Sequence, residues 1–131
     1  MPIGKPIKIG DLGKLTLAVN SKGDYDKTAP LIICFGGSDI AGRESGDYMY
    51  DYTSKFFNST GSLYNLFIAK NSNVDGLEAY NVVKDRLTNI LIIPKIEILF
   101  LFSNGYRPGI TLLKNKIDVF NKIYLVDIWM G

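Results

Sequence analysis

Histidine is absent from all 131 residues of this chain. Because histidine is the commonest general base and a usual metal ligand, its absence argues against histidine-dependent hydrolysis and against most transition-metal sites. Cysteine occurs once, as Cys34, and a single thiol forms neither an internal disulfide nor a zinc site. We expect Cys34, within the apolar run LIICF, to pack as a small core residue. The sequence predicts no cofactor and no metal.

Long apolar runs and an excess of one charge are also missing. No apolar segment approaches the roughly 20 residues that cross a bilayer, and the start MPIGKPIKIGDLGK has proline and glycine where a signal peptide carries its apolar centre. Fifteen Lys and Arg against thirteen Asp and Glu leave a net charge of +2, small for a protein that covers phosphates. We expect a cytoplasmic or virion protein, not secreted by a signal peptide, with neither a membrane nor a nucleic acid as partner.

The length and the 47% hydrophobic content are those of one globular domain. Proline and glycine recur through residues 1–13, which we predict to be an extended N-terminal arm without regular structure of its own. Such an arm has too few apolar contacts to fold alone, so we expect it to dock on the domain's own sheet edge or on a partner. Residues 14–131 are predicted to form a single α/β domain.

Strand patterns and helix patterns alternate along that domain. Alternating or continuous apolar residues predict strands at 14–19, 31–35, 63–69, 96–102 and 122–129. Spacings of three and four residues predict a helix over 46–57, a second after the capping residue Asp75, and a third with Pro108 in its first turn. The expected inward stripes are Met49, Tyr52 and Phe56; Leu77, Tyr80, Val83 and Leu87; and Ile110, Leu113 and Ile117.

This order of elements requires parallel pairing with helical crossovers for the last four strands. The predicted fold is therefore an α/β three-layer sandwich, with a mostly parallel sheet of about five strands and three helices. Strand 96–102 is expected in the middle of the sheet, because Ile98 to Phe102 are all apolar and burial on both faces is the simplest cause.

In an open parallel sheet, ligands collect outside the carboxyl ends of the strands. The candidate ligand or interface residues in those loops are Gly36, Gly37, Ser38, Asp39, Ser103, Asn104, Tyr106, Arg107 and Asp127. Two glycines after a strand suit close approach to a ligand, and they also suit a plain tight turn. Arg107 near a helix N-terminus suits an anion, and it also suits an ion pair with a nearby carboxylate, that of Asp39, Glu44 or Asp127. No residue is assigned a catalytic role.

The element order, with a two-glycine turn and a later sharp turn before a helix, resembles the first part of an α/β-hydrolase over residues 14–131. In that family a G-x-S-x-G turn carries the nucleophilic serine. Here the corresponding turn is Ser103-Asn104-Gly105-Tyr106-Arg107, which places Gly105 at the nucleophile and Arg107 where the family prefers glycine. The family's histidine is absent. The resemblance implies a shortened, inactive relative that hydrolyses no ester and is not labelled by a fluorophosphonate probe.

Two functions from different classes follow. The first is a noncatalytic structural or protein-interaction module that associates with itself or with a protein partner, as a component of a larger phage or bacterial assembly. Its support is the missing histidine, the predicted arm and the tyrosines at 48, 50 and 52, some of which must face outward. The alternative is a small hydrolase-like enzyme or ligand-binding domain that uses the crevice at the strand ends.

Overall fold

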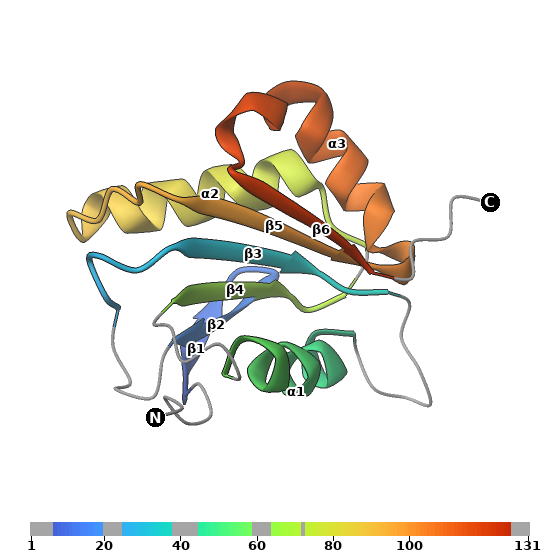
Figure 1. Cartoon of the computed structure of the whole chain (residues 1–131), viewed down its shortest axis with the longest axis horizontal. Helices are drawn as coiled ribbons and strands as arrows, with labels where there is room; N and C mark the ends of the chain where they lie inside the picture. The colour runs from blue at the N-terminus through green and yellow to red at the C-terminus, as the bar shows by residue number, and fades with distance from the viewer. Residues whose placement is uncertain (1–6, 20–24, 38–44, 59–63, 72, 127–131) are drawn as a thin grey trace.

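The computed structural model describes residues 7–19, 25–37, 45–58, 64–71 and 73–126, which fold around one six-stranded sheet (Figure 1). The strands are β1 (Ile7–Leu12), β2 (Leu15–Val19), β3 (Leu31–Phe35), β4 (Asn65–Ala69), β5 (Glu97–Phe102) and β6 (Lys122–Val126). The helices are α1 (Ser45–Asn58), α2 (Gly76–Asn89) and α3 (Tyr106–Lys116), with short 3-10 turns η1 (Ser103–Gly105) and η2 (Ile117–Val119).

The strands lie in the order β1-β2-β4-β3-β5-β6. β3 pairs in parallel with both β4 and β5, and β5 pairs in parallel with β6. At the other side, β2 pairs antiparallel with β4, and β1 pairs antiparallel with β2. The prediction of a mostly parallel α/β sheet with three helices is confirmed, including parallel pairing among the last four strands.

The sheet has six strands rather than about five, because part of the predicted arm is itself a strand. Residues Ile7–Leu12 form β1 at the edge of the sheet, where its backbone groups pair with β2. The side chain of Leu12 packs against the apolar core under α2 and α3. An extended chain with isolated apolar residues thus gains its hydrogen bonds from a neighbouring strand of the same domain.

The two faces of the sheet are covered by different helices. In Figure 1, α2 and α3 lie over one face and α1 lies against the other. Side chains of β3 alternate accordingly: Ile33 and Phe35 join the cluster under α2 and α3, whereas Ile32 and Cys34 join the cluster under α1. The expected core position of Cys34 is confirmed, and burial raises the pKa of its thiol above the usual range.

β5 has a neighbour on each side but is not one of the two central strands, which are β4 and β3. Its residues Leu99, Phe100 and Leu101 are buried, as predicted from its apolar run. β6 closes the described sheet at the opposite edge from β1. This last strand is much less covered, because Ile123 is 37% exposed and Leu125 is 62% exposed.

The inward face predicted for α2 is confirmed, since Tyr80, Val83 and Leu87 are buried. Asp75 caps this helix as expected, with its carboxylate accepting the Glu78 N–H at 2.9 Å. Among the described residues, no helix is both long and apolar enough to span a bilayer.

The inward faces of the other two helices differ from the predicted stripes. In α1, Met49 and Thr53 are buried, whereas Tyr52 is exposed and lies beside the rings of Phe100 and Phe102. The Thr53 hydroxyl can be buried because it donates to the Met49 carbonyl at 2.6 Å. The predicted Phe56 side chain lies outside the described residues.

α3 turns a different set of residues inward because a glycine lets it approach the sheet. Gly109 lies so close to Leu101 that an added Cβ would be 2.5 Å from a Leu101 methyl carbon. That approach buries Leu112 and leaves Ile110 and Leu113 half-buried. Ile117, the last residue of the predicted stripe, lies in η2 and is exposed.

Candidate functional site

The carboxyl ends of β3 and β5 lie side by side where the parallel strands finish. We call this the carboxyl edge of the sheet, as distinct from the lateral edges formed by β1 and β6. The two strands pair in parallel with Phe35 opposite Leu101, so the Gly36–Gly37 turn and the η1 turn follow them side by side. A Cβ on Gly105 would overlap the carbonyl of Phe35 and lie 2.9 Å from the carbonyl oxygen of Gly36. The structure therefore brings Gly36, Gly37, Ser103 and Gly105 together, and both glycine-containing turns are shaped by this close approach.

Ser103 has a backbone conformation that L-residues rarely adopt, with φ at 51°. It directly follows the extended Phe102 and is the first residue of η1, so the chain changes from strand to helical turn at this residue. A non-glycine residue in this region costs about 1 to 2 kcal/mol, and such residues cluster at functional sites. The strained residue of the turn is thus Ser103.

Gly105, the residue matched to the nucleophile from the sequence, has an ordinary helical φ of −62°. Glycine is needed there for space next to Phe35, not for its dihedral freedom. The nucleophile position inferred from the sequence, Gly105, is therefore two residues after the strained residue, Ser103. Spacing alone could not reveal this, because a positive φ at serine is imposed by how β5, η1 and α3 pack.

Tyr48 of α1 also reaches this edge, whereas the sequence pattern indicates only an interface role for it. A Cβ on Gly37 would lie 3.3 Å from the phenol oxygen of Tyr48 and 3.3 Å from the Ser103 Oγ, so the two hydroxyl groups flank one point. The N-terminus of α1 is held at the edge by a hydrogen bond from the Gly46 N–H to the Lys70 carbonyl at 2.8 Å. Tyr50 and Tyr52 pack along the neighbouring sheet surface.

The other candidate residues contribute less to this arrangement. Asn104 and Tyr106 are half-buried beside Ser103, and Arg107 is exposed in the first turn of α3. Ser38, Asp39 and Asp127 lie outside the described residues, as does Glu44, so the expected carboxylate partners of Arg107 do too. Among the described side chains, no three acidic or sulfur ligands gather where a metal ion could sit.

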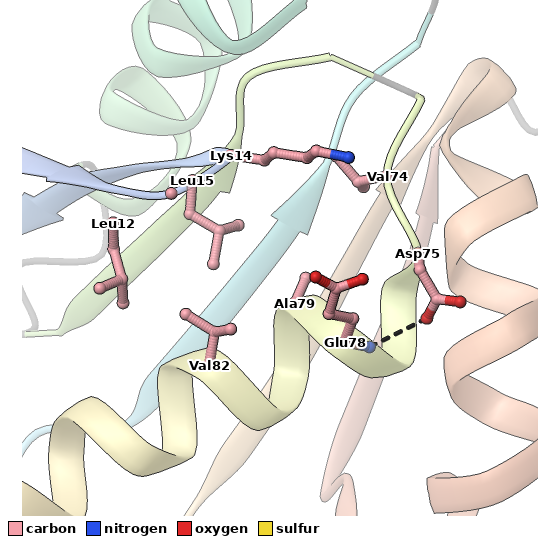
Figure 2. A pocket seen from close by; sticks show the side chains of 9 residues that line it. Leu12, Lys14, Leu15, Val74, Asp75, Glu78, Ala79 and Val82 are labelled. Carbon is pink, nitrogen blue, oxygen red and sulfur yellow. Dashed lines mark hydrogen bonds between the residues drawn. The ribbon is translucent and has the colours of Figure 1, made fainter.

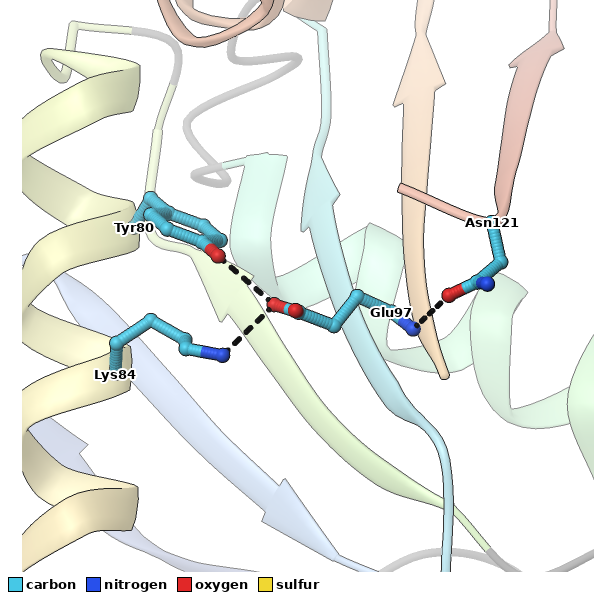
Figure 3. A network of polar contacts seen from close by, with 4 residues as sticks. All are labelled: Tyr80, Lys84, Glu97 and Asn121. Carbon is cyan, nitrogen blue, oxygen red and sulfur yellow. Dashed lines mark hydrogen bonds and ion pairs between the residues drawn. The ribbon is translucent and has the colours of Figure 1, made fainter. Parts of the chain in front are cut away.

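A polar network lies at the other end of the strands, around the amino end of β5 (Figure 3). The Glu97 carboxylate accepts a hydrogen bond from the Tyr80 hydroxyl at 2.9 Å and forms an ion pair with the Lys84 ammonium at 3.1 Å. Both partners belong to α2. Its backbone N–H donates to the Asn121 side chain at 2.8 Å. Burial, and then the Glu97 carboxylate, raise the pKa of Tyr80 above its usual range. The network ties α2, β5 and the start of β6 together, and it lies away from Ser103.

Comparisons with family models, with curated proteins and with solved structures gave no match for this chain.

Proposed function

We propose that the carboxyl edge of the sheet is a hydrolase-like acyl-transfer site with Ser103 as its nucleophile. The observation that carries this proposal is the φ of 51° at Ser103, the first residue of the helical turn that directly follows β5. A sharp, strained strand-to-helix turn is the geometry that presents a serine Oγ above a parallel sheet. The Gly36–Gly37 turn beside it supports the proposal, because glycine allows backbone N–H groups to come close to a developing oxyanion.

The proton of the Ser103 hydroxyl needs an acceptor other than histidine. We assign this role to Tyr48, whose phenol oxygen flanks the same point as the Ser103 Oγ. In the proposed step, Oγ bonds to the carbonyl carbon of an ester while its proton passes to the phenolate oxygen of Tyr48. The ester C–O bond then breaks as the leaving alkoxide takes that proton back, and water removes the acyl group left on Ser103.

A fluorophosphonate probe tests the nucleophile directly, since it phosphonylates activated serines. Contrary to the expectation from the sequence, we expect the full chain to be labelled at Ser103, as measured by intact mass and peptide mapping. Ser103→Ala should abolish the labelling, and Tyr48→Phe should slow it by at least about tenfold. Thr111→Ala is the matched control, because it removes a hydroxyl of α3 that donates to the Arg107 carbonyl.

Absence of labelling in the full chain, or equal labelling in Ser103→Ala, would contradict this function and leave the turn a purely structural feature. A Tyr48→Phe variant that reacts as fast as the unmodified chain would remove Tyr48 from the mechanism while retaining the nucleophile.

A second candidate function is a protein-interaction module, for which we propose β6 as the contact surface. β6 is the last strand of the described sheet, and Ile123 and Leu125 lie on one exposed face of it. Exposed apolar edge strands pair readily with other chains. The support for association thus comes from β6, whereas residues 7–12 of the predicted arm are used inside the domain.

Sedimentation velocity over a range of concentrations tests this second function. We expect self-association that Leu125→Lys abolishes, because a charged side chain on the β6 face cannot be buried in a dimer. Ile93→Lys is the matched control, since Ile93 is 84% exposed in the connection between α2 and β5. A chain that sediments as a monomer throughout, or two variants that behave alike, would argue against β6 as a self-association surface.

A further inference from the structure

A pocket of about 260 Å³ lies between the turn that joins β1 to β2 and the first turns of α2 (Figure 2). Its wall is apolar, and Leu15 and Ala79 are buried in it. The residues that line it are Leu12, Gly13, Lys14, Leu15, Val74, Asp75, Glu78, Ala79 and Val82. The pocket is on the side of the sheet covered by α2, and nothing in the site proposed at Ser103 uses it.

Charged groups of both signs stand at the rim of this apolar pocket. Figure 2 shows the Lys14 side chain reaching across from the strand side, while the Glu78 carboxylate points from α2 toward the same space. Both residues are exposed, and among the described residues neither side-chain charge forms an ion pair. Asp75 is already engaged, because its carboxylate caps α2 through the Glu78 N–H. The rim therefore carries one ammonium, from Lys14, and two carboxylates, of which that of Asp75 caps α2 and that of Glu78 is available to a ligand.

The size of the pocket limits what it can hold. A dry cavity of about 150 Å³ accommodates a benzene molecule, so the volume here suits a ligand of roughly ten non-hydrogen atoms. Apolar walls select an aliphatic body, and a pair of opposite charges at the rim selects a head group that carries both signs. A ligand with one charge would pair with only one of the two rim residues, and the other would stay hydrated.

We propose that this pocket binds a free aliphatic α-amino acid of about the size of leucine. The aliphatic side chain lies against Leu12, Leu15 and Val82, the ammonium group pairs with the Glu78 carboxylate, and the carboxylate pairs with the Lys14 ammonium. The β1–β2 turn completes the pocket, so the strand formed by residues 7–12 has a role in ligand binding besides covering the edge of β2.

Titration of the full, ¹⁵N-labelled chain with L-leucine tests the proposal by NMR. We expect saturable shifts of the backbone amides of residues 12–15 and 74–82. Two analogues separate the charges: 4-methylpentanoate lacks the ammonium group and 3-methylbutylamine lacks the carboxylate. Each should bind at least about tenfold more weakly than leucine, because one charge-assisted hydrogen bond is lost.

Variants of the two rim residues complete the test without disturbing the core. Glu78→Gln and Lys14→Met should each weaken leucine binding by about tenfold or more. The matched controls are Asp85→Asn, an exposed acid further along α2, and Lys27→Met, an exposed lysine outside the pocket. They should leave the affinity unchanged.

Three results would overturn the proposal. The first is the absence of saturable shifts up to about 20 mM leucine. The others are equal binding of leucine and both analogues, and leucine affinities of the rim variants that equal those of the control variants. Because Ser103 takes no part in this pocket, failure of leucine binding leaves the labelling experiment unaffected, and the reverse also holds.

Discussion

Leu99→Asp should abolish folding of the domain. Leu99 is fully buried in β5, where it joins the cluster between the sheet and the α2–α3 layer. The substitution removes an aliphatic side chain that stabilises by about 2 to 5 kcal/mol and places a carboxylate inside a cluster of buried hydrophobic residues. Since a domain of this size is stable by only about 5 to 15 kcal/mol, the two effects together exceed most or all of that margin.

The expected result is an insoluble or noncooperative protein by circular dichroism and thermal unfolding. Leu125→Asp is the matched control, because it makes the same replacement on the adjacent strand at a position that is 62% exposed. This control should unfold cooperatively, close to the unmodified chain. A soluble Leu99→Asp variant with a cooperative transition would show that β5 is not buried on both faces.

Gly105→Ala should destabilise the domain by about 2 to 4 kcal/mol, the upper range for overpacking a site that cannot yield. The added methyl group would overlap the backbone carbonyl of Phe35, and backbone at the end of a central strand has little freedom to move. Urea denaturation measures the loss. Because the turn must shift away from β3, fluorophosphonate labelling at Ser103 should fall as well.

Gly13→Ala is the control for Gly105→Ala, because it distinguishes destabilisation by steric overlap from destabilisation by backbone strain. Gly13 has a φ of 59°, and no atom lies within 4 Å of the place where its Cβ would be. Alanine there should cost only about 1 kcal/mol, from the left-handed conformation. If Gly105→Ala were no more destabilising than Gly13→Ala, the close contact between the η1 turn and Phe35 would not be a rigid part of the fold.

The elements of this fold were largely readable from local pattern. Asp75 and the stripe through Tyr80, Val83 and Leu87 predicted α2 correctly, because a side-chain cap and a spacing of three and four residues act within one segment. The apolar run of β5 predicted burial for the same reason. Parallel pairing followed from the alternation of strands and helices, since a strand that returns through a helix runs in the same direction.

Local pattern predicted less well which side of α1 and α3 faces the sheet. Both helices face the sheet with residues that are not large and apolar. These are Thr53 in α1, whose hydroxyl is hydrogen-bonded within the helix, and Gly109 in α3, which is small. Hydropathy assigns such residues little weight. Their value lies in close approach and in a hydrogen bond inside the helix, and both depend on the partner surface.

The candidate site shows the same division. That the turns after β3 and β5 should lie at one edge was predictable, because carboxyl ends of parallel strands share an edge, and the structure places Gly37 against Ser103. That Ser103 and not Gly105 takes the strained conformation, and that Tyr48 reaches the same point, was not predictable from spacing. The first depends on how the chain is held between β5 and α3, and the second on how α1 is anchored to the end of β4.

The amino-acid sequence by itself determined the α/β class, the helices and strands of the domain, the burial of Cys34 and the absence of histidine chemistry, because each depends on composition or on periodicity within one segment. Only the tertiary structure decided the strand order, the use of residues 7–12 as a sixth strand, the backbone conformation of Ser103 and the pocket beside α2. These features arise from contacts between segments far apart in the chain, and such contacts leave no periodic signal in any one of them.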